Sequence, residues 1–184
     1  MKKLLFPYLA QTSRKGWLLL IVVLQLILMF AFHGLFPFSV EKIAALSGGQ
    51  GIPDARMYYT YGQLQNMLVQ YGMVGRHMYL QLQWVDMVYP LIYSTLLGSL
   101  LFLVYKKTRL QPWAILPFAA ALFDYAENIL LRVSVQTFPQ MSVGVVKVAA
   151  LATFTKWFLL FVAFFLLVFG AIWRMAHWFR MRKK

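Results

Sequence analysis

The chain of 184 residues lacks cysteine altogether and has only five acidic residues. Without cysteine there is no disulfide, no thiolate nucleophile and no metal held by sulfur. The three histidines are dispersed, at positions 33, 77 and 177, and no His-x-x-His, Glu-x-x-His or His-Glu-x-x-His spacing occurs. We therefore expect no metal and no cofactor, with a magnesium site built from three carboxylates as the weaker alternative. The sequence also has no nucleophile elbow and no phosphate-binding glycine loop.

Charge as a whole is scarce, because 12% of the residues are charged and 61% are hydrophobic. An ordinary soluble chain has about a quarter of its residues charged and about half apolar. The apolar residues gather into runs of about 20 residues, the length at which a helix crosses about 30 Å of hydrocarbon. The sequence therefore predicts an all-α integral membrane protein, a four-transmembrane-helix bundle with residues 1–184 in a single domain.

The four predicted spans cover residues 17–36, 82–105, 112–133 and 145–173. The first follows basic residues and resembles the start of a signal peptide, but its apolar run is too long and no Ala-x-Ala site follows, so we expect a retained anchor. The one long loop, 37–81, contains the capping-box pattern Thr60-Tyr61-Gly62-Gln63. This pattern predicts a short amphipathic helix that ends near Gly72. Either a helix on the outer membrane surface or a packed connector fits this segment.

Basic residues indicate the orientation. The net charge is +13. Twelve Lys and Arg residues lie in the amino terminus, the 106–111 loop and the tail at 174–184. Only five lie in the 37–81 loop, the 134–144 connection and the adjoining helix ends. Because basic loops stay in the cytoplasm, both termini are expected there. This pattern explains the positive charge without a nucleic-acid partner, and membrane lipids are the expected partners instead. The short lysine-rich start and the compact loops favour a bacterial cytoplasmic membrane.

Four charged residues lie inside the predicted spans: Asp86 in the second, Asp124 and Glu127 in the third, and Lys156 deep in the fourth. Charge within a bilayer is costly and usually marks a site or a pairing. At about 100° per residue, Asp124, Glu127 and Asn128 share one small and polar face of their helix, which should turn toward the other helices. Lys156 shares its side with small residues, so it should also point inward.

Asp86 shares its helix face with Tyr89, Pro90 and Tyr93. Pro90 should kink the helix and free a carbonyl group near Asp86. Because the depths of the charged residues agree, we expect one polar cluster in the outer half of the bundle. Its expected members are Asp86, Tyr89, Tyr93, Asp124, Glu127, Asn128, Arg132 and Lys156, with Arg76 above it.

The first functional hypothesis is an intramembrane enzyme or binding protein for a lipid-like or isoprenoid-like small molecule, working by acid–base chemistry. Two neighbouring carboxyl groups in a medium of low dielectric do not both ionise readily, so one is expected to keep its proton. A protonated acid beside an ionised one is what acid–base catalysis uses. The predicted catalytic residues are Asp124, Glu127, Asp86, Tyr89 and Lys156. The predicted substrate-binding residues are Tyr93, Asn128, Tyr125, Arg132 and Arg76.

Two other functions fit the same residues. A proton- or ion-coupled transporter or channel subunit would use the buried charges as a relay, and it requires a homo-oligomer because four helices leave little room for alternating access. A structural subunit would use them as staples, with Asp86 paired to Arg132 and Lys156 to Asp124 or Glu127. A cavity open sideways to lipid favours the first hypothesis, a continuous aqueous path favours transport, and complete pairing without a void favours the staples.

Overall fold

In the computed structural model, which describes residues 2–182, every regular element is a helix. The elements are α1 (Lys2–Thr12), α2 (Lys15–Phe30), the π-helical turn η1 (Ala31–Leu35), α3 (Val40–Leu46), the 3₁₀ turn η2 (Pro53–Ala55), α4 (Tyr61–Asp86), α5 (Tyr89–Val104), the 3₁₀ turn η3 (Gln111–Ile115), α6 (Leu116–Gln136) and α7 (Val143–Arg182). Four helical stretches are long and apolar enough to cross a membrane: Lys15–Gly34, Tyr61–Val104, Gln111–Gln136 and Val143–Met181. The prediction of an all-helical chain with four apolar spans is confirmed at this level.

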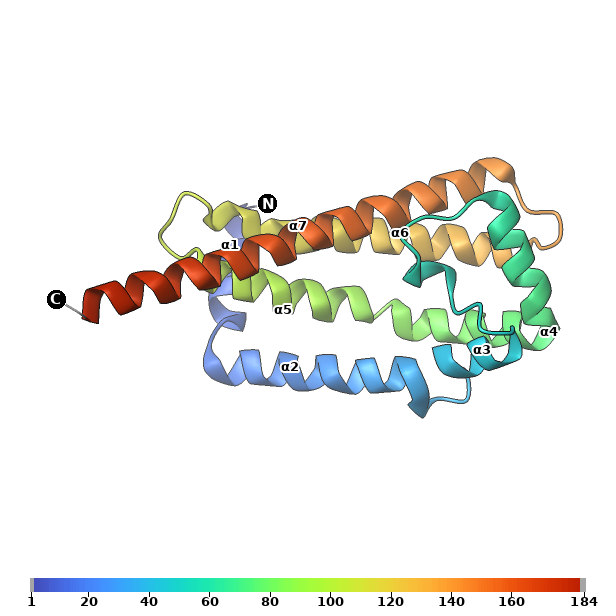
Figure 1. The fold of residues 1–184 in the computed structure, drawn as a ribbon, viewed down its shortest axis with the longest axis horizontal. Helices are drawn as coiled ribbons and strands as arrows, with labels where there is room; N and C mark the ends of the chain where they lie inside the picture. Colours follow the sequence, from blue (N-terminus) through green and yellow to red (C-terminus); the bar gives the residue numbers. More distant parts are fainter. Residues whose placement is uncertain (1, 183–184) are drawn as a thin grey trace.

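The long helices run along one common direction, with α5 in the middle, α6 and α7 on one side of it and α2 on the other (Figure 1). Both ends of the chain and the connection between α5 and α6 lie at one end of the bundle. The α3 helix, the first part of α4 and the connection between α6 and α7 lie at the opposite end. We call these the terminal end and the loop end.

The predicted second span is broken in the structure. The α4 helix ends at Asp86, Met87 and Val88 form a turn, and α5 then begins with Pro90 in its first turn. Proline has no N–H to continue the helix but fits a first turn, so the interruption follows from Pro90. The expected kink beside Asp86 is therefore present. The α4 helix is itself broken at Gly72, whose φ of 59° and ψ of −167° are readily adopted only by glycine.

A capping box begins α4. The Gln63 N–H donates to Thr60 Oγ1 at 3.3 Å, and the Thr60 N–H donates to Gln63 Oε1 at 2.8 Å. Replacing Thr60 by alanine should lower the free energy of unfolding by about 1 kcal/mol, because it removes the acceptor for a helix N–H. Unfolding in mixed detergent measures this. The control is Ser39→Ala, since Ser39 stands at the start of α3 without a capping hydrogen bond; equal losses in both variants would contradict the assigned cap.

The amino terminus forms a helix that the sequence analysis did not predict. The α1 helix folds back along α5, where a hydrogen bond of 2.6 Å joins Thr12 Oγ1 to Ser99 Oγ and one of 2.9 Å joins Tyr8 Oη to Thr95 Oγ1. Leu9 is fully buried in an apolar cluster with residues of α5 and α7. This cluster joins α1 to α5 and α7.

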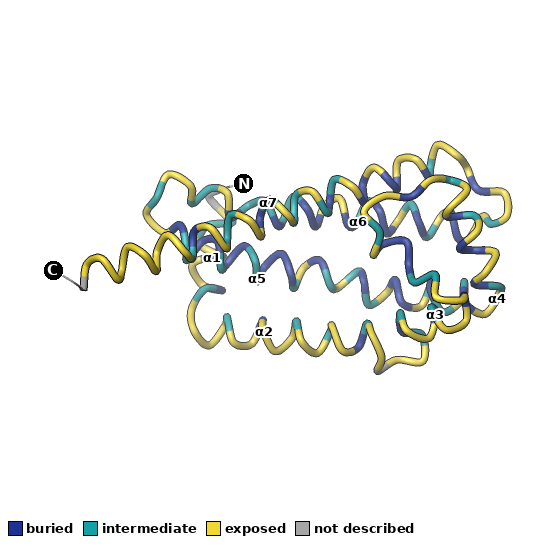
Figure 2. The backbone as a smooth tube through the Cα atoms, in the orientation of Figure 1, coloured by how far each residue is buried: buried dark blue, intermediate teal, exposed yellow. Residues whose placement is uncertain are grey.

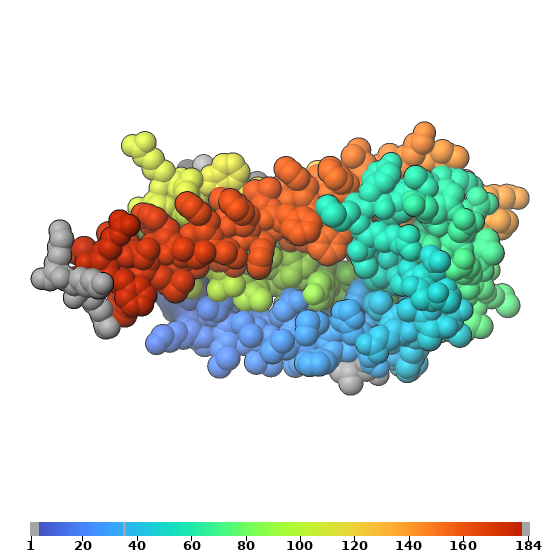
Figure 3. All heavy atoms as spheres, in the orientation of Figure 1, coloured from blue at the N-terminus to red at the C-terminus, as the bar shows by residue number. Residues whose placement is uncertain are grey.

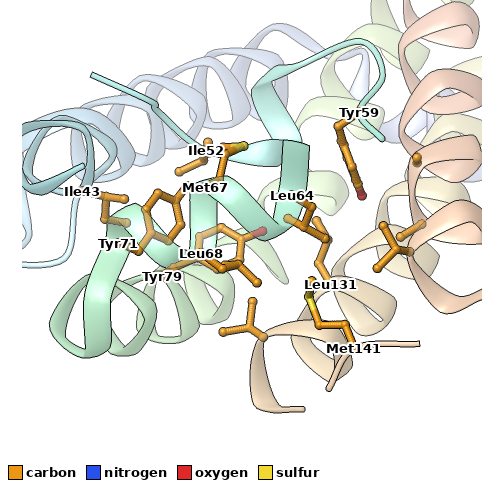
Figure 4. Packing of buried hydrophobic residues seen from close by; sticks show 14 of the residues in the cluster. Ile43, Ile52, Tyr59, Leu64, Met67, Leu68, Tyr71, Tyr79, Leu131 and Met141 are labelled. Carbon is orange, nitrogen blue, oxygen red and sulfur yellow. The ribbon is translucent and has the colours of Figure 1, made fainter. Parts of the chain in front are cut away.

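The long loop is also folded against the bundle. Figure 4 shows Ile43, Ile52 and Leu64 packed into one apolar cluster that reaches Leu131 of α6 and Met141. Leu64 in the first part of α4 is fully buried, as expected of a packed connector. The loop therefore covers the loop end of the bundle with an apolar core of its own.

The outside of the long helices is apolar. Figure 2 shows that α2 and the distal half of α7 are largely exposed. Their exposed side chains include Leu20, Leu24, Ile27, Phe164, Phe165 and Phe169. A soluble monomer rarely exposes so continuous an apolar surface, whereas a bilayer would cover it. This surface is compatible with a membrane protein.

Candidate functional site

A cavity of about 520 Å³ lies among α2, α5, α6 and α7, next to residues 52–55 of the long loop. Most of its wall is apolar. The apolar residues of the wall include Met29, Leu96, Leu97, Leu160, Phe161 and Phe164. One part is polar and is formed by Asp54, Asp86, Tyr89, Tyr93, Asp124 and Lys156. We call this part the polar end of the cavity. Five of the residues predicted for a site thus line one space.

The cavity reaches the side of the bundle between α2 and α7. Its lining residues Phe161 and Phe164 on α7 are 53% and 58% exposed, and Met29 on α2 is also exposed. In Figure 3 the green atoms of α5 lie recessed between the orange-red atoms of α7 and the blue atoms of α2. A molecule can therefore enter sideways, from the direction in which a bilayer would lie.

The long loop closes the cavity toward the loop end. The indole N–H of Trp157 donates to the Asp54 carbonyl at 3.1 Å, and the hydroxyl of Tyr71 donates to the Gly51 carbonyl. The hydroxyl groups of Thr153 and Tyr59 lie 3.5 Å apart and join the same loop to α7. These contacts hold residues 51–59 against the helices on the loop-end side of the cavity.

Lys156 joins two carboxylates of α6. Its Nζ atom donates to Asp124 Oδ1 at 3.2 Å and also forms an ion pair with Glu127. Thr153 Oγ1 donates to Glu127 Oε1 at 2.6 Å, and Tyr93 OH donates to Asp124 Oδ2 at 2.9 Å. The structure therefore brings together Asp124, Glu127 and Lys156 as expected. Glu127 is 0% exposed and lies outside the cavity lining.

Asp86 faces the cavity without a cationic partner. Its side chain is buried, and no basic side chain that the structure describes forms an ion pair with it. The Asp86 main-chain carbonyl is the one that Pro90, four residues later, cannot bond. Asn128 Nδ2 donates to this carbonyl at 3.4 Å, and Gln83 Nε2 donates to the Asn128 carbonyl at 3.3 Å. Asn128 therefore fixes the position of the helix end that carries Asp86.

Asp54 belongs to the site, although the sequence analysis did not select it. It is 7% exposed, Tyr79 OH donates to its Oδ2 at 2.8 Å, and its Oδ1 has no hydrogen-bond partner in the described part of the chain. Burial raises the pKa of Asp54 above its ordinary value, and the nearby charge of Lys156 opposes that rise. Asp54 lies in a loop without helical periodicity, so only the scarcity of acids in the chain could have drawn attention to it.

The α2 helix reaches the polar end through Gln25. Its Nε2 donates to Tyr89 OH at 2.8 Å, and the Tyr89 ring stacks on Phe32 with the ring centroids 5.8 Å apart. His33 also lines the cavity but is itself exposed at the rim. Tyr89 is thus where α2 docks onto the site.

Four predicted binding residues lie outside the cavity lining: Asn128, Tyr125, Arg132 and Arg76. Arg132 donates to the Leu80 carbonyl at 3.2 Å and lies over the Trp84 ring, so the pair with Asp86 required by the staple hypothesis is absent. Arg76 donates to the Leu68 carbonyl at 2.8 Å and lies over a phenylalanine ring. Both guanidinium groups therefore bind carbonyl oxygens and aromatic faces and do not line the cavity.

Among the described residues, no group of three or more His, Cys, Asp or Glu side chains is placed to hold a metal ion. Comparisons of the chain with protein-family models, with curated proteins and with solved structures gave no match. The geometry and chemistry of the cavity are therefore the basis for a function.

Proposed function

We propose that this chain is an integral membrane protein that binds a lipid-like or isoprenoid-like molecule in its cavity and acts on it by acid–base chemistry. One observation carries the proposal. A largely apolar cavity opens on the apolar side of the bundle, and its polar end holds carboxyl groups that no described basic residue neutralises. The volume of about 520 Å³ is within the range of small-molecule sites, about 300–1,000 Å³.

The apolar wall suits a hydrocarbon chain. Leu96, Leu97 and Leu160 line the cavity between its polar end and its opening. Each methylene group buried against such side chains contributes about 0.8 kcal/mol, so a chain of several carbons binds there with useful affinity. The polar group of the same molecule would then lie beside the carboxyl groups.

Asp86 is the group best placed to exchange a proton with a bound molecule, because it lines the cavity and forms no ion pair with a described side chain. Asp124 is the second acid of the lining, and Tyr93 OH donates to it. Lys156, which is also paired with Glu127, holds Asp124 in place through an ion pair. The reaction class is proton transfer within the substrate, as in isomerisation, cyclisation or dehydration. Asn128 positions the helix end that carries Asp86, and Tyr89 positions α2 beside the polar end of the cavity.

The alternatives have less support. The staple hypothesis requires every charge to be paired and no void to remain, yet Asp54 and Asp86 form no ion pair with a described side chain and the cavity lies beside them. Transport requires a continuous polar path, but an apolar cluster that includes Leu9, Leu101 and Phe102 lies between α1, α5 and α7 toward the terminal end. A pocket that opens sideways supports a binding protein or an enzyme instead.

We also propose that the terminal end faces the cytoplasm. Within residues 2–182, this end carries the amino terminus, the 106–111 loop and the distal part of α7, which hold ten of the eighteen basic residues of the sequence. Basic residues are retained on the cytoplasmic side during insertion. The polar end of the cavity would then lie nearer the outer surface.

The first test fills the cavity. Leu97→Trp should displace the bound molecule, because the larger side chain occupies the apolar wall. The protein is purified in mild detergent and the lipids that accompany it are measured by mass spectrometry. A species enriched with the wild type should fall to the background level in Leu97→Trp. It should persist in the control Leu122→Trp, because Leu122 is on the outer face of α6 and is 69% exposed. Absence of any enriched lipid from the wild type would contradict the proposed function.

A further inference from the structure

The polar end of the cavity has more acids than bases. Asp54, Asp86 and Asp124 line it, and Glu127 lies directly behind Lys156. Among the described residues lining the cavity, Lys156 is the one lysine or arginine, and its ammonium group is already shared by Asp124 and Glu127. No permanent positive charge is left for Asp54 or Asp86.

Two buried carboxyl groups therefore lack a partner that such groups usually have, either an ion pair or a hydrogen bond. Among the side chains that the structure describes, Asp86 is 6% exposed and forms no ion pair, and Asp54 Oδ1 has no hydrogen-bond partner. Buried polar and charged groups are normally satisfied, because leaving them without partners costs several kcal/mol. Both side chains line the same empty space, so a bound molecule is in a position to supply what they lack.

Aromatic rings surround the same space. Tyr89 and Tyr93 belong to the polar end, with their ring centroids 5.7 Å apart, and Trp157 lines the same cavity. Lys156 Nζ already lies 5.8 Å from the centroid of the Trp157 ring. Aromatic faces attract cations, and cages of aromatic rings with nearby acids recognise ammonium groups. The rings and the unpaired carboxylates thus both favour a ligand with a positive charge.

We propose that the molecule bound in this cavity is an amphiphile whose polar group is a positively charged ammonium, with Asp86 and Asp54 as its counter-charges. This inference rests on the proposed function, because it assumes that the cavity takes a lipid-like molecule. The ammonium lies among Asp54, Asp86 and the aromatic rings, and the hydrocarbon chain runs along the apolar wall toward the opening between α2 and α7.

The test compares dodecylammonium, 1-dodecanol and dodecanoate, which share one chain length and differ in the charge of the polar group. Binding to the full chain in nanodiscs of zwitterionic lipid is measured by native mass spectrometry. The wild type should bind the amine at least about tenfold more tightly than the alcohol, a ratio that corresponds to about 1.4 kcal/mol. Asp86→Asn and, separately, Asp54→Asn should reduce this preference. The matched control Glu41→Gln should keep it, because Glu41 is exposed and lies outside this cavity.

The outcomes separate the two proposals. Equal binding of alcohol and amine by the wild type overturns the ammonium ligand, because it means that the carboxyl groups neutralise themselves with protons, and it leaves the lipid cavity standing. A preference for the amine that survives in both aspartate variants overturns the assigned counter-charges. If none of the three amphiphiles binds and Leu97→Trp changes no accompanying lipid, the proposed function itself fails.

Discussion

Replacing Asp86 by asparagine is expected to slow the proposed reaction by roughly 10²–10⁴-fold while the fold remains intact. Asparagine has nearly the same shape but cannot give or take a proton at this position. Because Asp86 forms no ion pair with any side chain that the structure describes, its loss leaves no described partner charge buried and unpaired. The lipid identified from the purified wild-type protein serves as the substrate, and its conversion is followed by mass spectrometry in reconstituted vesicles.

The control for this experiment is Glu41→Gln, which removes one acid outside the cavity and should convert the lipid at the wild-type rate. Thermal stability of both variants is measured in parallel, so that a folding defect is not taken for a chemical one. Conversion at the wild-type rate by a stable Asp86→Asn protein would show that Asp86 exchanges no proton with the substrate.

Replacing Lys156 by methionine is expected to lower the free energy of unfolding by roughly 3–5 kcal/mol, the loss typical of removing one partner from a buried ion pair. Lys156 is 5% exposed and neutralises Asp124 and Glu127 together. Without it, two buried carboxyl groups lie side by side on α6 with no cation on α7 to pair with them, so the contact between α6 and α7 weakens. Unfolding in mixed detergent measures the change.

Two further variants identify the cause. Lys147→Met removes a lysine from the same helix at an exposed position and should change stability little. The double variant Lys156→Met with Glu127→Gln should recover part of the loss, because it removes one of the two stranded acids. If the double variant is no more stable than Lys156→Met alone, packing of the lysine chain rather than its charge would explain the effect.

The inward face of each helix was predictable from local spacing. Asp124 and Glu127 stand three residues apart on α6, so one turn of helix places them side by side without help from the rest of the fold. Lys156 lies on the small-residue side of α7, where helices approach closely. The convergence of these three residues follows from the two helix faces. The break at Pro90 follows in the same way from its missing N–H.

Residues outside the periodic helices were not predictable by the same reasoning. Asp54 reaches the cavity because residues 51–59 are tied down by Tyr71, Tyr79 and Trp157, all distant in the sequence. Arg132 turns away from Asp86 because the Leu80 carbonyl and a tryptophan face hold it elsewhere. The spacing of residues along a helix does not predict contacts with these partners.

The chain's own residue pattern determined which stretches are helical and apolar, which faces turn inward and which acids share a helix face, because each of these depends on neighbours within one or two turns. The tertiary structure alone decided that Asp54 joins the site, that Glu127 lies behind Lys156 and that a cavity opens between α2 and α7. These features depend on how the long loop and α2 pack against the other helices, and that packing is set by contacts between residues far apart in the sequence.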